Sequence, residues 1–173
     1  MLTMFLFLIL VWAFYIGYSR GFGLQVFYTL SSLLALVVAN LMFKELATHL
    51  TLWIPYSNPT QESSVSFFQS VNLFDLDRVY YAGVAFVGVY VLVYGIGRLL
   101  GIFAHLLSFE RFDSRFFAII GGMLSVGVSG LSLGLLLSVL ATVPIVGLQH
   151  FLSTSILARF FIYIVSFITN SWI

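Results

Sequence analysis

Long apolar stretches, uncharged apart from Arg98, alternate with polar segments along this chain, and four of the stretches have the length of membrane spans. They cover residues 2–18, 22–43, 79–107 and 116–143. A helix that crosses the hydrocarbon core of a bilayer needs roughly 20 predominantly apolar residues, with a range of about 17–25. The last stretch exceeds this range, so we expect it to be tilted or to project beyond the bilayer. The pattern predicts an all-α membrane protein with about four transmembrane helices.

The first two stretches are joined by a very short connection. Only Ser19, Arg20 and Gly21 lie between them. A connection this short forces its two helices to run antiparallel, so we predict a tight hairpin with Arg20 at its tip. A second polar turn, residues 108–115, joins the last two stretches into another hairpin.

The connection between the hairpins, residues 44–78, is long and polar. It contains four of the six acidic residues of the chain: Glu45, Glu62, Asp75 and Asp77. Leu46, Leu50 and Ile54 recur at spacings of four, which predicts a short amphipathic helix at the membrane interface. Pro55 is expected to end this helix, and a polar loop to follow it.

The C-terminal segment, residues 151–173, combines apolar and polar positions. Its polar residues fall on one stripe of a helix: Ser155, Arg159, Tyr163, Ser166 and Asn170. An arginine in the middle of a span costs about 2.5–3.5 kcal/mol on insertion scales. We therefore predict an amphipathic C-terminal helix that lies in the interface or packs into the bundle, in preference to a fifth span. Residues 1–173 then form a single integral membrane domain.

Composition supports the assignment to a membrane. The chain is 61% hydrophobic and 8% charged, whereas soluble domains carry about 25% charged residues. The net charge of +1 offers no electrostatic basis for binding nucleic acid. The absence of cysteine removes disulfides and thiolate metal sites, and we expect no metal and no cofactor. The expected partners are the lipid bilayer and either other membrane proteins or a second copy of the chain.

Basic residues near the ends of spans predict the orientation, because they favour the cytoplasmic side. Arg20, Arg111 and Arg115 fall on one side, while Lys44 and Arg78 are spread over the long acidic connection. We predict that the Arg20 tip and the turn at residues 108–115 are cytoplasmic. Both termini and the connection 44–78 are then extracytoplasmic.

Arg98 is the only charged residue inside a predicted span. It could contact an anion or a lipid headgroup, or its side chain could extend to the nearby interface, and the second interpretation is favoured. The spans contain no Asp or Glu, which weakens the case for a proton-coupled transporter without excluding it.

The last span contains two serine strings that resemble hydrolase motifs. Gly127–Gly130 matches the GxSG string of rhomboid proteases, and Gly130–Gly134 matches the GxSxG nucleophile elbow. A serine nucleophile needs a base within hydrogen-bond reach, and the elbow needs a turn from a strand into a helix. The three histidines lie near or beyond the span ends: His49, His105 and His150. We therefore expect no catalytic residue and no enzymatic activity.

A different interpretation of the same span is favoured. Small residues at intervals of four allow two helices to pack closely in a membrane. The residues assigned to this packing face are Gly127, Gly130, Gly134 and Ser138.

Two segments carry a family resemblance. The first is Gly17-Tyr18-Ser19-Arg20-Gly21-Phe22, and the second runs from Phe112 to Gly122 and leads into the small-residue span. Together they resemble the colicin V production protein (CvpA) family of bacterial inner-membrane proteins, as does Leu152–Ala158. The resemblance points to seven motif residues, none with a catalytic role: Gly17, Arg20, Gly21, Phe22, Asp113, Arg115 and Gly121. The chain departs from the family pattern in its long polar connection and in lacking a lysine after the glycine-rich helix.

The resemblance implies a location in the bacterial cytoplasmic membrane and a role in peptide toxin production or export and in envelope homeostasis. The first hypothesis for the molecular role is an accessory or scaffold protein that works through helix packing. The alternative is a small oligomeric transporter or channel, motivated by Arg98 and the polar stripe of the tail. A third hypothesis, an intramembrane hydrolase, rests on the serine strings alone.

Overall fold

The computed structural model is all-α and describes residues 1–56, 65–68, 71–72, 75–104 and 114–173. The described elements are α1 (Leu2–Arg20), α2 (Phe22–Leu50), α3 (Leu76–Ala104), α4 (Arg115–Ala141), α5 (Val146–Thr154), α6 (Ile156–Ile164), α7 (Ser166–Thr169) and η3 (Asn170–Trp172). In these ranges four helices, α1 to α4, are long and apolar enough to cross a membrane, which confirms the predicted fold class. The predicted end of the third span, residues 105–107, lies outside the described ranges.

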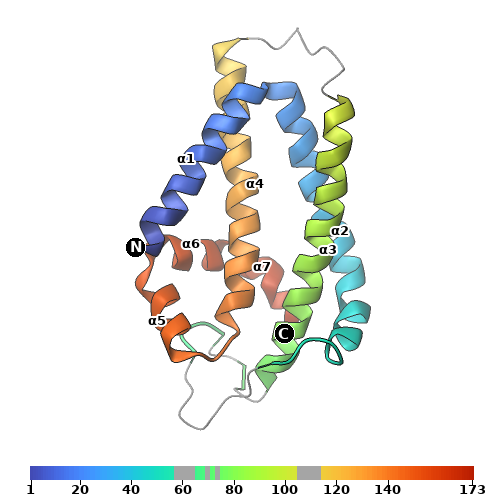
Figure 1. The fold of residues 1–173 in the computed structure, drawn as a ribbon, viewed down its shortest axis with the longest axis vertical. Coiled ribbons are helices and arrows are strands. Elements are labelled where there is room, and N and C mark those ends of the chain that lie inside the picture. The colour runs from blue at the N-terminus through green and yellow to red at the C-terminus, as the bar shows by residue number, and fades with distance from the viewer. Residues whose placement is uncertain (57–64, 69–70, 73–74, 105–113) are drawn as a thin grey trace.

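The long helices run side by side between two ends of the bundle (Figure 1). One end carries Arg20, Arg98 and the start of α4, and we call it the Arg20 end. The other carries Lys44, the start of α3 and the end of α4, and we call it the Lys44 end. Large apolar side chains cover much of the surface between the two ends, as expected where the surrounding solvent is lipid.

The predicted hairpin of α1 and α2 has the expected short connection, a single residue. Gly21 adopts a φ of 84°, a left-handed conformation that favours glycine. The two helices then diverge from the Arg20 end, and α4 lies between them (Figure 1). The main packing partners are therefore α2 with α3 and α1 with α4. The hairpin is tight at its tip but is not packed along its length.

The boundary between α2 and the polar connection is a correction to the sequence prediction. α2 continues through Lys44 to Leu50, so the predicted separate interface helix at Leu46–Ile54 is mostly its last turns. Between Gly23 and Pro55 the chain contains no proline or glycine. At 1.5 Å per residue α2 is about 44 Å long, which exceeds the roughly 30 Å hydrocarbon core. Its charged last turns can therefore project into the interface.

The tail is also more broken than predicted. In place of one helix over 151–173, it forms α5, α6, α7 and η3. The break between α5 and α6 falls at Ser155, whose hydroxyl accepts a hydrogen bond from the Ala158 backbone N–H at 3.3 Å and caps α6. α6 crosses the bundle between α1 and the region of α7 (Figure 1) and packs on α4. Of the two predicted arrangements, the tail adopts the one packed into the bundle.

Candidate functional site

α1 and α4 approach each other closely near the Arg20 end. A Cβ atom on Gly17 would meet the Gly121 carbonyl oxygen at 2.6 Å and the Ser125 side chain still closer. A Cβ atom on Gly121 would lie 3.0 Å from the Gly17 carbonyl oxygen and 3.6 Å from Phe22 Cα. The Phe22 and Phe117 rings pack beside this crossing with their centroids 5.2 Å apart. The two motif segments, far apart in sequence, thus meet in one helix crossing.

The predicted small-residue face of α4 packs against the tail. A Cβ atom on Gly130 would lie 2.8 Å from Phe161 Cε1, and one on Gly134 would lie 2.7 Å from Val165 Cγ1. Ser138 is fully buried, one turn further along. Gly127, assigned to the same face, instead has no atom within 4 Å of a built Cβ. Gly130 and Gly134 therefore make room for the aromatic and branched side chains of α6 and its C-cap.

Two arginines converge on one tyrosine at the Arg20 end. The guanidinium carbons of Arg20 and Arg98 lie 5.2 Å and 4.8 Å from the centroid of the Tyr28 ring, within the range of cation–π attraction. Arg98 also donates a long hydrogen bond to the Tyr94 hydroxyl at 3.5 Å. Gly101 leaves space for the Tyr28 ring, because a Cβ atom on Gly101 would overlap the ring. We call Arg20, Arg98, Tyr28 and Tyr94 the arginine–tyrosine cluster.

A chain of hydroxyl groups crosses the bundle interior midway along α3. Tyr90 lies between Ser32 of α2 and Ser132 of α4, with oxygen–oxygen distances of 2.9 Å and 2.8 Å. Ser132 donates its single proton to the Val128 carbonyl at 2.9 Å. Tyr90 must therefore donate to Ser132 and accept from Ser32, so the bonds run in one direction. These bonds connect three helices at a depth where water is absent.

Two of these hydrogen bonds involve Ser132, a serine of the hydrolase-like strings in α4. The Ser132 hydroxyl, the central serine of the GxSxG string, is held by Tyr90 and Val128. Among the described residues no histidine is a partner of Ser132, and His105 lies outside them. Ser132 also lies inside a continuous helix and not on a turn from a strand. Ser132 is therefore a hydrogen-bonded residue inside a packed helix.

At the Lys44 end the irregular chain is attached to the end of α4 by side chains. The Tyr56 hydroxyl donates to the Thr142 carbonyl at 2.8 Å. Gln149 donates from Nε2 to the Ala141 and Val143 carbonyls, each at 2.9 Å, and accepts from the Ser66 backbone N–H at 3.0 Å. These bonds occupy carbonyl groups that Pro144 prevents from continuing the helical pattern.

The polar stripe predicted on the tail lines a pocket of about 410 Å³ at this end. Four of the five predicted residues are among its walls: Arg159, Tyr163, Ser166 and Asn170. The fifth, Ser155, is buried and bonds to the Thr3 hydroxyl at 3.0 Å. Phe67 and Phe68 form the opposite wall. The stripe therefore faces a pocket between the tail and the segment that carries Phe67 and Phe68.

Comparisons with known proteins extend over most of the chain. The profile of the family described as Colicin V production protein matches residues 2–166. This chain belongs to that family. It is also 27% identical over 160 residues to the uncharacterized transmembrane protein YshB of Bacillus subtilis (strain 168), covering 92% of this chain and 88% of that protein. No solved structure matches the chain.

In this member of the colicin V production protein family, the structure brings together four of the seven motif residues. Gly17, Gly21 and Phe22 lie against Gly121 at the α1–α4 crossing. Arg20 turns to Tyr28 instead, Arg115 is the exposed first residue of α4, and Asp113 lies outside the described residues. The motif glycines thus determine how α1 and α4 meet.

Some residues of this family member escaped the sequence prediction. Gly97 and Gly101 of α3 lie against Ser31 and Tyr28 of α2. Their spacing of four is the same small-residue signal that was used for α4, and it could have identified them. Tyr90 was a weaker candidate for a structural role, because it places a hydroxyl group midway along an apolar span. Nothing in the sequence indicates its hydrogen-bond partners.

Proposed function

We propose that this multi-pass membrane protein is an accessory or scaffold protein that acts through helix packing and its exposed ends, without catalysis. The observation that carries the proposal is the α1–α4 crossing, where four of the residues that carry the family resemblance pack closely. Glycines form the contact, with the Ser125 side chain and the Phe22 and Phe117 rings packed around it. The Tyr90 hydroxyl chain supports the same conclusion, because its hydroxyl groups are used in hydrogen bonds that join the helices.

The family resemblance supports a role for this accessory protein in peptide toxin production or export and in envelope homeostasis, within the bacterial cytoplasmic membrane. The arginines at the Arg20 end support an orientation in which that end is cytoplasmic and both termini are extracytoplasmic. A reporter that is active only in the cytoplasm, fused after Ile173, should be inactive. Activity of that fusion would reverse the orientation.

Reconstitution tests the accessory role directly. Purified full-length protein in liposomes should not change the permeability to protons, to inorganic ions or to a short peptide beyond that of protein-free vesicles. The gene should nevertheless restore the envelope phenotype of a strain that lacks it. Solute movement by the purified protein alone would contradict the proposal.

The alternative function, a small oligomeric transporter or channel, is favoured by one observation. Arg20 and Arg98 approach the same Tyr28 ring and not separate points on the interface. Such a pair could attract an anion to the mouth of a path formed by several copies. Arg98→Gln should then abolish solute movement and the phenotype, whereas the accessory role predicts that both the phenotype and the protein level are retained.

A further inference from the structure

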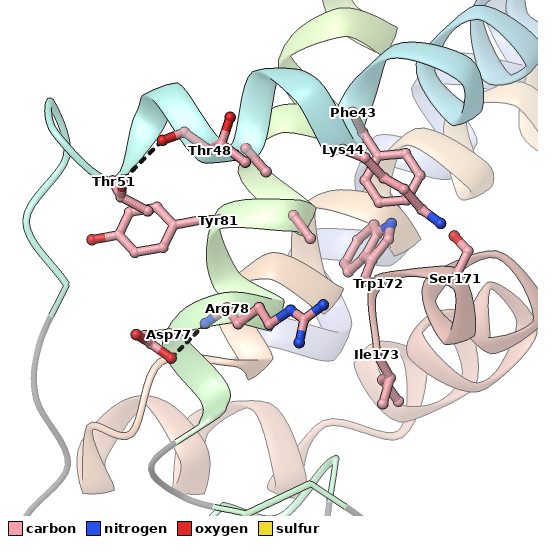
Figure 2. Close-up of a pocket in the computed structure, with 12 residues that line it drawn as sticks. Phe43, Lys44, Thr48, Thr51, Asp77, Arg78, Tyr81, Ser171, Trp172 and Ile173 are labelled. Atoms are coloured by element: carbon pink, nitrogen blue, oxygen red, sulfur yellow. Dashed lines mark hydrogen bonds between the residues drawn. The ribbon is translucent and has the colours of Figure 1, made fainter.

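A pocket at the Lys44 end lies between α2, α3 and the segment Ser171–Ile173, and it contains about 370 Å³ (Figure 2). Part of its wall is apolar, formed by Phe43 and Ala47 of α2 and by Ala82 of α3. The remainder carries charged and hydroxyl groups: Lys44, Thr48, Thr51, Asp77, Arg78 and Ser171. The pocket therefore offers both a polar and an apolar surface to one ligand.

The two cations of the pocket come from different helices. Figure 2 shows Lys44 of α2 and Arg78 of α3 both extending toward the segment Ser171–Ile173. In the described part of the chain, neither cation forms an ion pair with a carboxylate. Asp77 also lines the pocket, but its Oδ1 accepts the backbone N–H of Arg78 at 2.6 Å. Its carboxylate lies on the far side of Arg78 from Lys44 (Figure 2), so it does not neutralise the space between the cations.

Trp172 supplies a third donor. Its side chain is only 3% exposed, and its indole Nε1 has no hydrogen-bond partner among the described residues. The edge of the ring that carries Cε3 and Cζ3 packs on Gly83, which places Nε1 on the opposite edge. In Figure 2 this nitrogen is on the side of the ring that faces Lys44. A buried N–H without an acceptor is rare in native proteins and indicates a missing partner.

We propose that this pocket binds a phosphate group, with its oxygens paired to Lys44 and Arg78 and with the Trp172 indole beside it. Phosphate is an acceptor-only anion, and arginine can hold two of its oxygens at once while lysine acts as a compact charge. The apolar wall then holds the carbon part of the ligand. Either an anionic phospholipid headgroup or a free phosphate could supply this chemistry. The site is separate from the proposed accessory role and does not depend on it.

Trp172 can report on its own pocket. The chain has three tryptophans, and the other two, Trp12 and Trp53, are 64% and 82% exposed, so both tolerate replacement by phenylalanine. The Trp12→Phe/Trp53→Phe protein would be placed in phosphatidylcholine nanodiscs and titrated with inorganic phosphate. In parallel, it would be placed in nanodiscs with brominated phosphatidylglycerol or with brominated phosphatidylcholine, because bromine quenches a tryptophan that it contacts.

We expect at least one of two responses. Stronger quenching by brominated phosphatidylglycerol than by brominated phosphatidylcholine assigns the site to a lipid headgroup. A saturable change in Trp172 emission with inorganic phosphate, without a lipid preference, assigns it to free phosphate. If neither response occurs in folded protein, the proposal is wrong.

Variants test whether the two cations cause the response. Lys44→Gln/Arg78→Gln should weaken the response about tenfold or more, since each charge-assisted bond contributes about that factor to affinity. Arg115→Gln removes one exposed cation at the Arg20 end and should leave the response unchanged. Gel-filtration profiles and helical circular dichroism establish that the variants are folded. A response that persists in the folded double variant overturns the assignment.

Discussion

The carbonyl oxygen of Gly17 in α1 lies 3.0 Å from the point where a Cβ atom on Gly121 in α4 would stand. The contact is between the backbones of two helices, with no flexible side chain to move aside. It lies beside Gly21, where the chain reverses between α1 and α2. The hairpin tip and the start of α4 are therefore joined by a backbone contact that leaves little room for a side chain at Gly121.

This contact predicts that α4 tolerates substitution very differently at two of its glycines. Gly121→Leu should destabilise the protein by about 1–3 kcal/mol or more, because the added side chain must force the two backbones apart. Gly127→Leu, on the same helix, should have little effect or be slightly stabilising, since no atom lies within 4 Å of its Cβ position. Unfolding by titration with a denaturing detergent measures both. Equal losses for the two variants would contradict the crossing.

The hydroxyl chain predicts a modest loss of stability when Tyr90 is changed. Tyr90→Phe removes two hydrogen bonds between helices while keeping the ring in place. Such bonds in membrane proteins contribute about 0.6 kcal/mol on average and up to about 1.7, so the loss should be about 1–3 kcal/mol. Tyr94→Phe, one turn along α3, loses only the 3.5 Å bond from Arg98 and serves as the control. A larger loss in the control would show that Tyr90 does not connect the helices.

The docking of the tail onto α1 can be tested by a designed disulfide. The chain has no cysteine, so an added pair reacts without competition. The hydroxyl oxygens of Thr3 and Ser155 are 3.0 Å apart, and Thr3→Cys/Ser155→Cys should therefore crosslink under mild oxidation. The neighbouring pair Thr3→Cys/Thr154→Cys should crosslink more slowly, because the Thr154 hydroxyl bonds to the His150 carbonyl and not to Thr3. Gel mobility after proteolytic cleavage between the two positions measures the bond, and equal rates would place the tail elsewhere.

Tyr56 predicts a loss of stability at high pH. Burial, with smaller contributions from Asp77, Tyr80 and Tyr81, raises the pKa of Tyr56 from its ordinary value of 10.0 to about 12. The native state therefore holds this proton more tightly than the unfolded state, so the contribution to stability is complete below pH 10. It is lost as the pH rises from 10 to about 12.

The Tyr56→Phe variant isolates this effect, because it lacks the titrating hydroxyl and its bond to Thr142. The difference in stability between the native protein and the variant should be constant below pH 10 and should shrink above it. Detergent-induced unfolding at a series of pH values measures the difference. If the stability difference stays constant from pH 10 to about 12, burial does not raise the pKa of Tyr56.

The four spans and the short connection between the first two could be predicted from the sequence, because long apolar runs and the break at Arg20–Gly21 are local features. The connection was predicted as three residues and is one. The pairing of α1 with α4 could not be predicted, since helices that are apolar on all sides give no indication of which face is buried. The break at Ser155 was also missed. A serine there fits the polar stripe of one long helix as well as it fits the cap of a new one, and only tertiary packing separates the two.

The candidate sites also divide into those that a local sequence pattern predicts and those that depend on tertiary packing. Gly130 and Gly134 were predictable as packing residues, because their spacing of four is a local signal. Gly127, three residues before Gly130, was assigned to the same packing face, but no atom lies within 4 Å of a Cβ atom built on it. The convergence of Arg20 and Arg98 on Tyr28, and of Lys44 and Arg78 on one pocket, depends on how separate helices are arranged in space.

The central claim is that this family member works through the packing that its motif glycines permit. The most direct measurement is the rescue of a strain that lacks the gene, with Gly121→Leu, Gly127→Leu and Arg98→Gln compared at matched protein levels. We predict that Gly127→Leu and Arg98→Gln restore the envelope phenotype and that Gly121→Leu does not. Rescue by Gly121→Leu together with failure of Arg98→Gln would contradict the claim and favour transport.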